Sequence, residues 1–170
     1  SSTSLTIGTL FACSNGSHGI TNVIGDGLRA TTITASSNGV GGIQYGWSPN
    51  GGDGWIITTL TLNNNSWHGF SGTNNSFIRV TTLTVSDNAQ GGLGVSGQAS
   101  SWYIETYTAI GNGGIGLYLN VNQQDWRINT CTCQNNSIGV YLWPTSAYLH
   151  VTIGTLTTSG NSTAGLSCNL

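Results

Sequence analysis

The side chains with the most regular spacing in this chain are threonines, whose hydroxyls both donate and accept hydrogen bonds. Thr-X-Thr triplets such as Thr32-Ile33-Thr34 return about every 24 residues. We call their two threonine positions the threonine columns. The columns hold thirteen threonines: Thr9, Thr32, Thr34, Thr59, Thr61, Thr82, Thr84, Thr106, Thr108, Thr130, Thr132, Thr155 and Thr157. Phe11 takes the remaining position. This uncharged pattern predicts contact with an ordered surface rather than with a protein, which would need aromatic anchors.

Carboxylates offer the other chemistry to consider, because polysaccharide-cleaving enzymes cluster them as a metal site or an acid–base pair. The five carboxylates are scattered over different repeats: Asp26, Asp53, Asp87, Glu105 and Asp125. Glu105 lies near the positions of Arg79 and Arg127, which predicts a surface ion pair. The chain has no lysine to act as a base. We therefore expect no catalytic site and no cofactor.

Histidine and cysteine give no clear metal site either. The three histidines stand at separated positions: His18, His68 and His150. Cys131 and Cys133 are two residues apart on one strand face, which disfavours a bridge between them. Cys168 could approach one of them across the interior, whereas Cys13 is expected to be free and buried, or paired outside the chain.

The elements that position these groups follow from an internal repeat. The pattern of Asn, three residues, Gly and an apolar residue occurs seven times, at intervals of 23 to 27 residues. Its asparagines are Asn15, Asn38, Asn65, Asn88, Asn112, Asn135 and Asn161. In the sixth repeat Asn136 fits the upstream strand better than Asn135. A period near 24 without helical periodicity predicts a β-solenoid in which each repeat is one rung.

Apolar and polar residues alternate before each asparagine, which predicts strands with one buried face. A break in the alternation predicts a bend in each of these strands. The asparagines should stack as a hydrogen-bonded ladder, and we expect them to adopt left-handed backbone conformation themselves. Insertions are expected as loops at residues 24–27, 46–54, 71–76, 120–124 and 143–147. The predicted fold is all-β: a parallel β-helix (β-solenoid) of seven rungs of about 24 residues, right-handed, in one domain over residues 1–170.

Composition narrows the class of partner. Only 5% of the 170 residues are charged, and the net charge is −2, so nucleic-acid binding is not expected. No apolar run reaches the ~18 residues of a membrane span. Four cysteines and abundant Asn, Ser, Thr and Gly favour a secreted, extracellular protein, and a start at Ser1 suggests a mature product or an excised segment. We expect a monomer.

Strand dimensions fix the geometry of the threonine columns. Threonines two apart on a strand face lie ~6.7 Å apart, and equivalent threonines on adjacent rungs lie ~4.8 Å apart. Seven rungs give a strip ~29 Å long. Threonine favours strands in any sheet, but that preference alone predicts mixtures with other residues. Other outward columns show such mixing; one of them holds Thr6, Arg29, Ile56, Arg79, Tyr103, Arg127 and Thr152.

With its repeated Thr-X-Thr triplets, the sequence resembles the β-solenoid ice-binding (antifreeze) proteins over all seven rungs. The resemblance implies that the protein binds ice, or ordered water, through the threonine columns. The rungs are nearly twice as long as those of the insect members, and they lack a regular disulfide ladder. Their length is instead similar to that of the right-handed parallel β-helices of pectate-lyase-like enzymes and phage tailspikes.

Two alternatives stay open. A virion, tailspike or extracellular adhesion segment would use aromatic side chains that stack on sugars if exposed. The candidates are Tyr45, Trp47, Trp67, Tyr141 and Trp143. A polysaccharide lyase or hydrolase would instead need the scattered carboxylates to converge.

Overall fold

A computed structural model describes residues 4–21, 27–45, 54–73, 77–97, 100–120, 125–143 and 150–169. These residues form fourteen strands in two seven-stranded parallel sheets. The odd-strand sheet contains β1 (Leu5–Phe11), β3 (Leu28–Thr34), β5 (Ile56–Asn63), β7 (Arg79–Ser86), β9 (Tyr103–Ile110), β11 (Trp126–Gln134) and β13 (Val151–Ser159). The even-strand sheet contains β2 (Ile20–Thr21), β4 (Ile43–Tyr45), β6 (His68–Thr73), β8 (Gly91–Ser96), β10 (Ile115–Asn120), β12 (Ile138–Trp143) and β14 (Ala164–Cys168).

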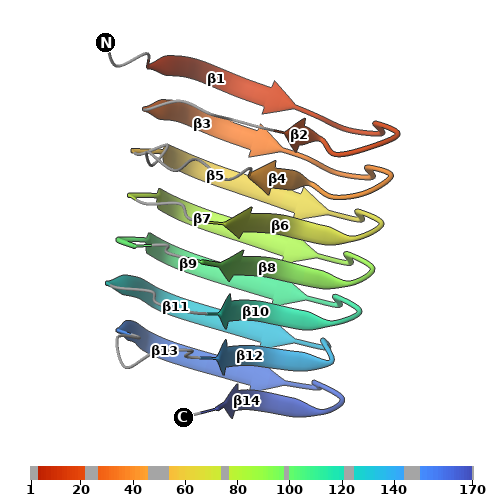
Figure 1. The fold of residues 1–170 in the computed structure, drawn as a ribbon, viewed down its shortest axis with the longest axis vertical. Coiled ribbons are helices and arrows are strands. Elements are labelled where there is room, and N and C mark those ends of the chain that lie inside the picture. Colours follow the sequence, from red (N-terminus) through yellow and green to blue (C-terminus); the bar gives the residue numbers. More distant parts are fainter. Residues whose placement is uncertain are drawn as a thin grey trace.

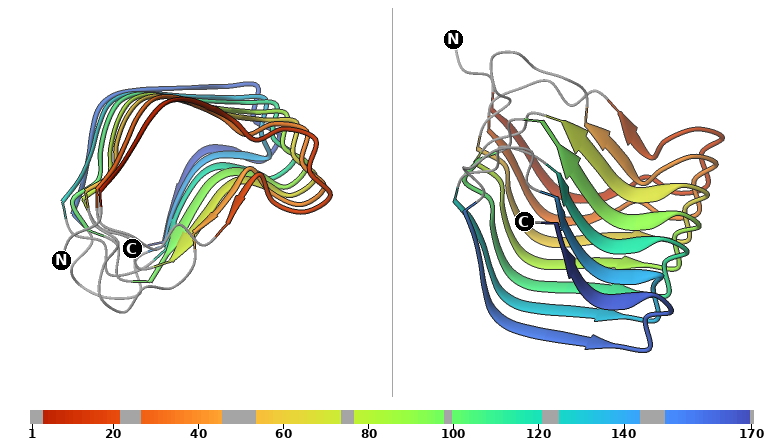
Figure 2. Two further views of the ribbon diagram at one scale, coloured as in Figure 1. Left: turned by 90° about the horizontal axis from the view of Figure 1, so that it is seen from above. Right: turned by 60° about the horizontal axis from the view of Figure 1, so that its bottom comes forward.

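The two sheets make a right-handed coil. The odd strands run in one direction at the back of the molecule, and the even strands return at the front while the chain descends one rung at a time (Figure 1). The same path around the rungs is visible from above (Figure 2). This is the handedness that parallel strands joined by crossovers adopt. The predicted β-solenoid of seven rungs is therefore confirmed.

Each odd strand bends once, at the position that the break in alternation predicts. In β3, Ala30 and Ile33 are buried, whereas Thr31 and Thr32 between them both face outward. Two consecutive outward residues cannot lie on a straight pleated strand, so the strand turns a corner there. Seen from above, the corner separates a short face from a longer, straight face (Figure 2).

The interior is a stack of apolar ladders between the two sheets. The largest fully buried side chains include Trp55, Trp102 and Trp126. Trp102 and Trp126 stack with ring centroids 4.4 Å apart, and Phe70 meets Trp102 edge-on at 5.5 Å. Tyr107 is also buried, and its hydroxyl donates to the Gly116 carbonyl over 2.6 Å. Burial of these rings fixes the spacing of the two sheets.

An asparagine ladder runs through the turn between the sheets, as predicted. Five of its members are almost completely buried: Asn38, Asn65, Asn88, Asn112 and Asn136. The backbone N–H and side-chain Nδ2 of Asn65 both donate to Oδ1 of Asn88 on the next rung, over 3.1 and 2.9 Å. Its Nδ2 also donates to the Ala35 carbonyl on the rung before. Each of the five buried asparagines therefore ties three rungs together, and Asn136 is the sixth anchor.

Left-handed backbone occurs one residue earlier than we expected. The residue before each ladder asparagine has a positive φ, between 54° and 68°: Ser14, Ser37, Asn64, Asp87, Gly111, Asn135 and Gly160. The expectation that the asparagines themselves adopt this conformation was wrong. The positive φ turns the chain out of the odd strand, and the asparagine that follows then points inward.

The expected loops lie largely outside the described residues. Three of the predicted loops were too long, because residues 71–73, Asn120 and Trp143 belong to strands of the even-strand sheet. The inward and outward side chains of these strand residues alternate as in the neighbouring rungs. The described residues include no helix long and apolar enough to cross a membrane.

All four cysteines are free. Cys131 and Cys133 are buried on one strand face with their sulfurs 3.8 Å apart, so the expectation that they do not bridge is met. The hydrogen bond with the Cys131 thiol, together with burial, raises the pKa of Cys133 far above its usual range. Cys168 is exposed at the last rung instead of bridging across the interior. Cys13 is free but exposed, so the expected burial was wrong.

Candidate functional site

The threonine columns lie on the straight outer part of the odd-strand sheet. Strand pairing sets Thr9 opposite Thr32, and the same register continues through every later rung to Thr155. The second column pairs in the same way from Phe11 to Thr157. One register shift would move a threonine into the core, and none occurs in these pairings.

The columns are evenly supported from below. Beneath the middle of the strip, Leu60, Leu83 and Tyr107 are at most 2% exposed. The threonines of the middle rungs are themselves half-buried by their neighbours, whereas Thr9, Thr155 and Thr157 near the ends are exposed. A β-branched side chain has few rotamers, and lateral contact on both sides restricts it further.

The odd strands stay close to parallel from β1 to β13 (Figure 1). Ladders of identical side chains favour such weak twist. At ~4.8 Å per rung and ~6.7 Å between the columns, the hydroxyls and methyl groups form a regular, repeating array.

Three further threonines extend this surface, and the sequence argument missed them. Thr31, Thr58 and Thr81 precede a column threonine directly and face outward at the bend. The signal was present as Thr-Thr pairs in three successive rungs. In the next two rungs the same place holds Glu105 and Asn129, so this third column is short.

No family model, no curated protein and no solved structure matches this chain. Its function must therefore be argued from its surfaces, because a fold alone does not specify one.

A charged cluster lies around the corner from the threonine columns. The Tyr103 hydroxyl donates to the Glu105 carboxylate, and Asn129 Nδ2 donates to the Tyr103 hydroxyl over 2.9 Å. The Arg79 guanidinium sits over the Tyr103 ring, 5.1 Å from its centroid. The expected ion pair of Glu105 with arginine was therefore wrong in its contact, since tyrosine is the bonded partner. That hydrogen bond lowers the pKa of Glu105 and raises the pKa of Tyr103.

The other candidate chemical groups do not come together among the described residues. No group of three or more His, Cys, Asp or Glu in this part of the chain could hold a metal. Asp125 Oδ1 lies 3.0 Å from Nδ1 of His150 at an exposed site, within hydrogen-bond distance. Asp26 and Asp53 lie outside the described residues.

Aromatic side chains gather on the even-strand sheet instead. Tyr118 and Tyr141 stack on adjacent rungs, with centroids 5.6 Å apart and planes 19° apart. Trp143 meets Tyr141 edge-on at 5.6 Å and is 41% exposed. Trp67 is similarly exposed, at the turn before β6, where it contacts His68. The Tyr45 side chain and Trp47 lie outside the described residues. Tyr118 was not among the aromatic candidates, although the repeat sets it at the same position as Tyr141 one rung away, where the pairing of β10 with β12 brings the two together.

Proposed function

We propose that this protein binds ice through the threonine columns. The observation that carries the proposal is the register: each of the seven odd strands presents threonine at the same outward position, and six of them present a second. The proposed contact residues are the thirteen threonines of the columns. Thr31, Thr58 and Thr81 extend this contact surface at its edge, since they face outward on the same rungs.

Chemistry supports an ordered solid as the partner. Methyl groups favour caged water, and hydroxyls can anchor that water by hydrogen bonds at a regular spacing. Because the threonines are held by β-branching and by their neighbours, little side-chain entropy remains to be lost on binding. The columns carry no charge, whereas the arginines stand before the bend and Glu105 stands at the bend itself.

Strand propensity explains some threonine but not this distribution. Cross-strand threonine pairs contribute ~0.2–1 kcal/mol each wherever a sheet is exposed. The same argument applies to the outward column of the even-strand sheet, which holds Thr21, Gln44, Ser71, Gly94, Tyr118, Tyr141 and Ser167 in register. That column contains one threonine, so the preference of threonine for strands does not by itself produce a column made of threonine alone.

Thermal hysteresis of the purified protein tests the proposal directly. We expect a gap between the freezing and melting points that grows with protein concentration and is absent for an inert protein of the same size. A gap equal to that of the inert protein would reject ice binding. The proposal also places the protein outside the cell, as a monomer that acts without catalysis or cofactor.

A further inference from the structure

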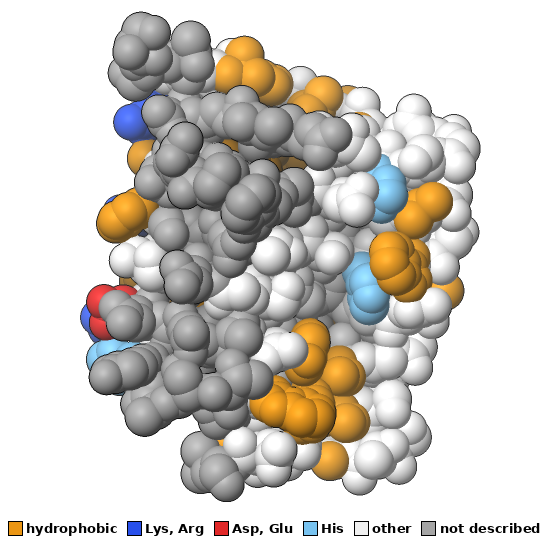
Figure 3. All heavy atoms as spheres, in the orientation of Figure 1, with side chains coloured by type: hydrophobic (Ala, Val, Ile, Leu, Met, Phe, Trp, Pro, Cys, Tyr) orange, Lys and Arg blue, Asp and Glu red, His pale blue; other side chains and the backbone are white. Residues whose placement is uncertain are grey.

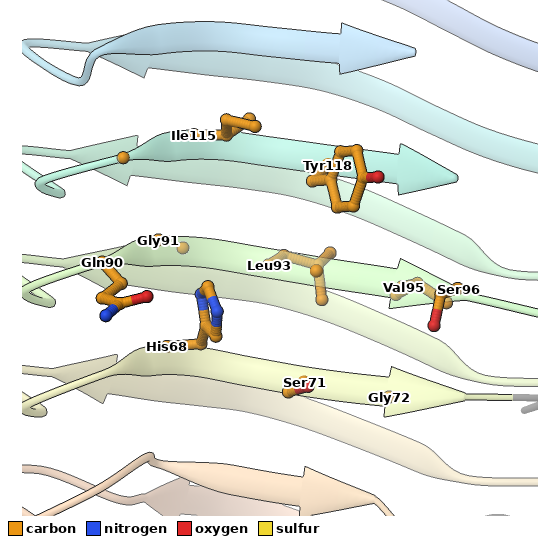
Figure 4. Close-up of a pocket in the computed structure, with 13 residues that line it drawn as sticks. His68, Ser71, Gly72, Gln90, Gly91, Leu93, Val95, Ser96, Ile115 and Tyr118 are labelled. Atoms are coloured by element: carbon orange, nitrogen blue, oxygen red, sulfur yellow. The ribbon is translucent and has the colours of Figure 1, made fainter. Parts of the chain in front are cut away.

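The even-strand sheet carries a groove that ice binding does not use. The groove has a volume of about 350 Å³, within the ~300–1,000 Å³ of small-molecule sites. Tyr118 on β10 bounds one side, and His68 and Ser71 on β6 bound the other, with β8 between them (Figure 4). The groove exists because Gly94 stands between Ser71 and Tyr118 in the outward column and leaves its place on β8 empty.

The wall at Tyr118 continues as an aromatic surface. Tyr118, Tyr141 and Trp143 contact one another across two rungs, so each ring is held by the next. Hydrophobic side chains gather at the C-terminal rungs of this face (Figure 3). Tyr118 therefore lies between Tyr141 on the next rung and the space left by Gly94 on the rung before.

Uncharged hydrogen-bonding groups stand opposite the aromatic wall. His68, Ser71, Gln90 and Ser96 line the groove, and none of its lining residues carries a full charge. Burial lowers the pKa of His68, so its imidazole is neutral at pH 7 and offers one donor and one acceptor. His68 is positioned by Gly91, where a Cβ would come within 2.8 Å of its Nδ1.

We propose that this groove and the adjoining aromatic surface bind a neutral polysaccharide. One face of a sugar ring presents C–H groups, which are attracted to the negative face of an aromatic ring such as Tyr118. The hydroxyls at the ring edge then reach Ser71, Gln90 and His68, which can donate and accept. The absence of charge in the lining favours a neutral chain over an anionic one, because no cation is present to pair with a carboxylate or sulfate.

The groove and the threonine columns lie on different sheets, so the two proposals stand independently. A protein with both surfaces could hold a glycan and contact ice at once. Each surface can therefore be tested with variants that leave the other intact.

Binding is measured by co-sedimentation with insoluble cellulose, chitin and β-1,3-glucan, and by gel retardation in xylan and mannan. We expect retention by at least one of these neutral polymers and none by polygalacturonate. Tyr118→Ala should weaken that binding at least 10-fold. Phe77→Ala is the matched control, because Phe77 is 56% exposed and lies outside the groove. It should bind as the wild type does.

Gly94→Val provides a variant that fills the groove without removing a contact. A Cβ at Gly94 meets nothing closer than the Phe70 carbonyl oxygen at 3.7 Å, and valine favours a strand more than glycine does. We expect at least a 10-fold loss of glycan binding with unchanged or higher thermal stability and unchanged thermal hysteresis. Failure of the wild type to bind any neutral polymer, or wild-type binding by both Gly94→Val and Tyr118→Ala, would overturn the proposal.

Discussion

Thr82→Lys separates ice contact from folding. Thr82 lies on β7, the fourth of the seven odd strands, and pairs with Thr59 and Thr106. A lysine there projects from the middle of the lattice. Since Thr82 faces outward and is only partly buried, the free energy of unfolding should change by no more than about 0.5 kcal/mol.

The size of the functional effect follows from the rung spacing. The protrusion leaves three intact rungs on either side, so the continuous strip falls from ~29 Å to two pieces of ~10 Å. A crystal surface is rigid and cannot close around the lysine. If adsorption requires continuous contact, thermal hysteresis should fall to less than about a third of the wild-type value at equal concentration.

Nanolitre osmometry measures the hysteresis, and circular dichroism during heating measures folding. Gln44→Lys is the matched control, because Gln44 is an exposed residue in the middle of β4, on the other sheet. It introduces the same side chain and the same charge, and should leave hysteresis unchanged. Full activity in Thr82→Lys together with its loss in Gln44→Lys would show that the wrong face was chosen.

Three other predictions concern stability and reactivity. Asn88→Ala should lower the free energy of unfolding by about 3 kcal/mol in urea titrations, because it leaves two buried donors of Asn65 without their acceptor; a loss below about 1 kcal/mol would contradict the ladder's role. Glu105 has a lowered pKa in the folded state, so its small contribution to stability should be present above its ordinary pKa of 4.5 and decline as the pH falls through the lowered value. Glu105→Gln should remove that pH dependence, and an unchanged profile would refute the Tyr103 contact. Two thiols should react with Ellman's reagent in the native protein and four in denaturant, since Cys13 and Cys168 are exposed whereas Cys131 and Cys133 are buried.

Much of the fold was predictable because the repeat states the same pattern seven times. Register in a sheet is fixed when one face must be buried, and the inward ladder around Leu83 leaves each threonine pair a single outward place. The slip from Asn135 to Asn136 could also be read, since the upstream strand aligns with its neighbours only in that frame.

The remaining features depend on contacts that alternation does not encode. Two outward residues at a bend look like an ordinary polar pair, so Thr31 was not assigned to the surface. We paired Glu105 with arginine because the alignment of the repeats puts the opposite charges of Arg79 and Arg127 on the neighbouring rungs. The hydrogen bond to Tyr103 instead depends on side-chain conformations within one strand, which the alignment does not reveal. The groove arises where Gly94 has no side chain. A glycine in the sequence does not indicate whether its neighbours on adjacent strands are large enough to form the walls of a groove.

The rungs contact chiefly their immediate neighbours, and this makes the length of the molecule an adjustable quantity. The stability of such stacks is approximately a sum of rung terms and nearest-neighbour terms. Tandem duplication of one repeat in the gene would therefore add ~4.8 Å and two threonines to the strip without disturbing any existing pairing. Selection could tune the strength of surface attachment by changing the number of repeats, with no need to optimise individual side chains. Variants with one rung duplicated or deleted would measure how activity scales with that count.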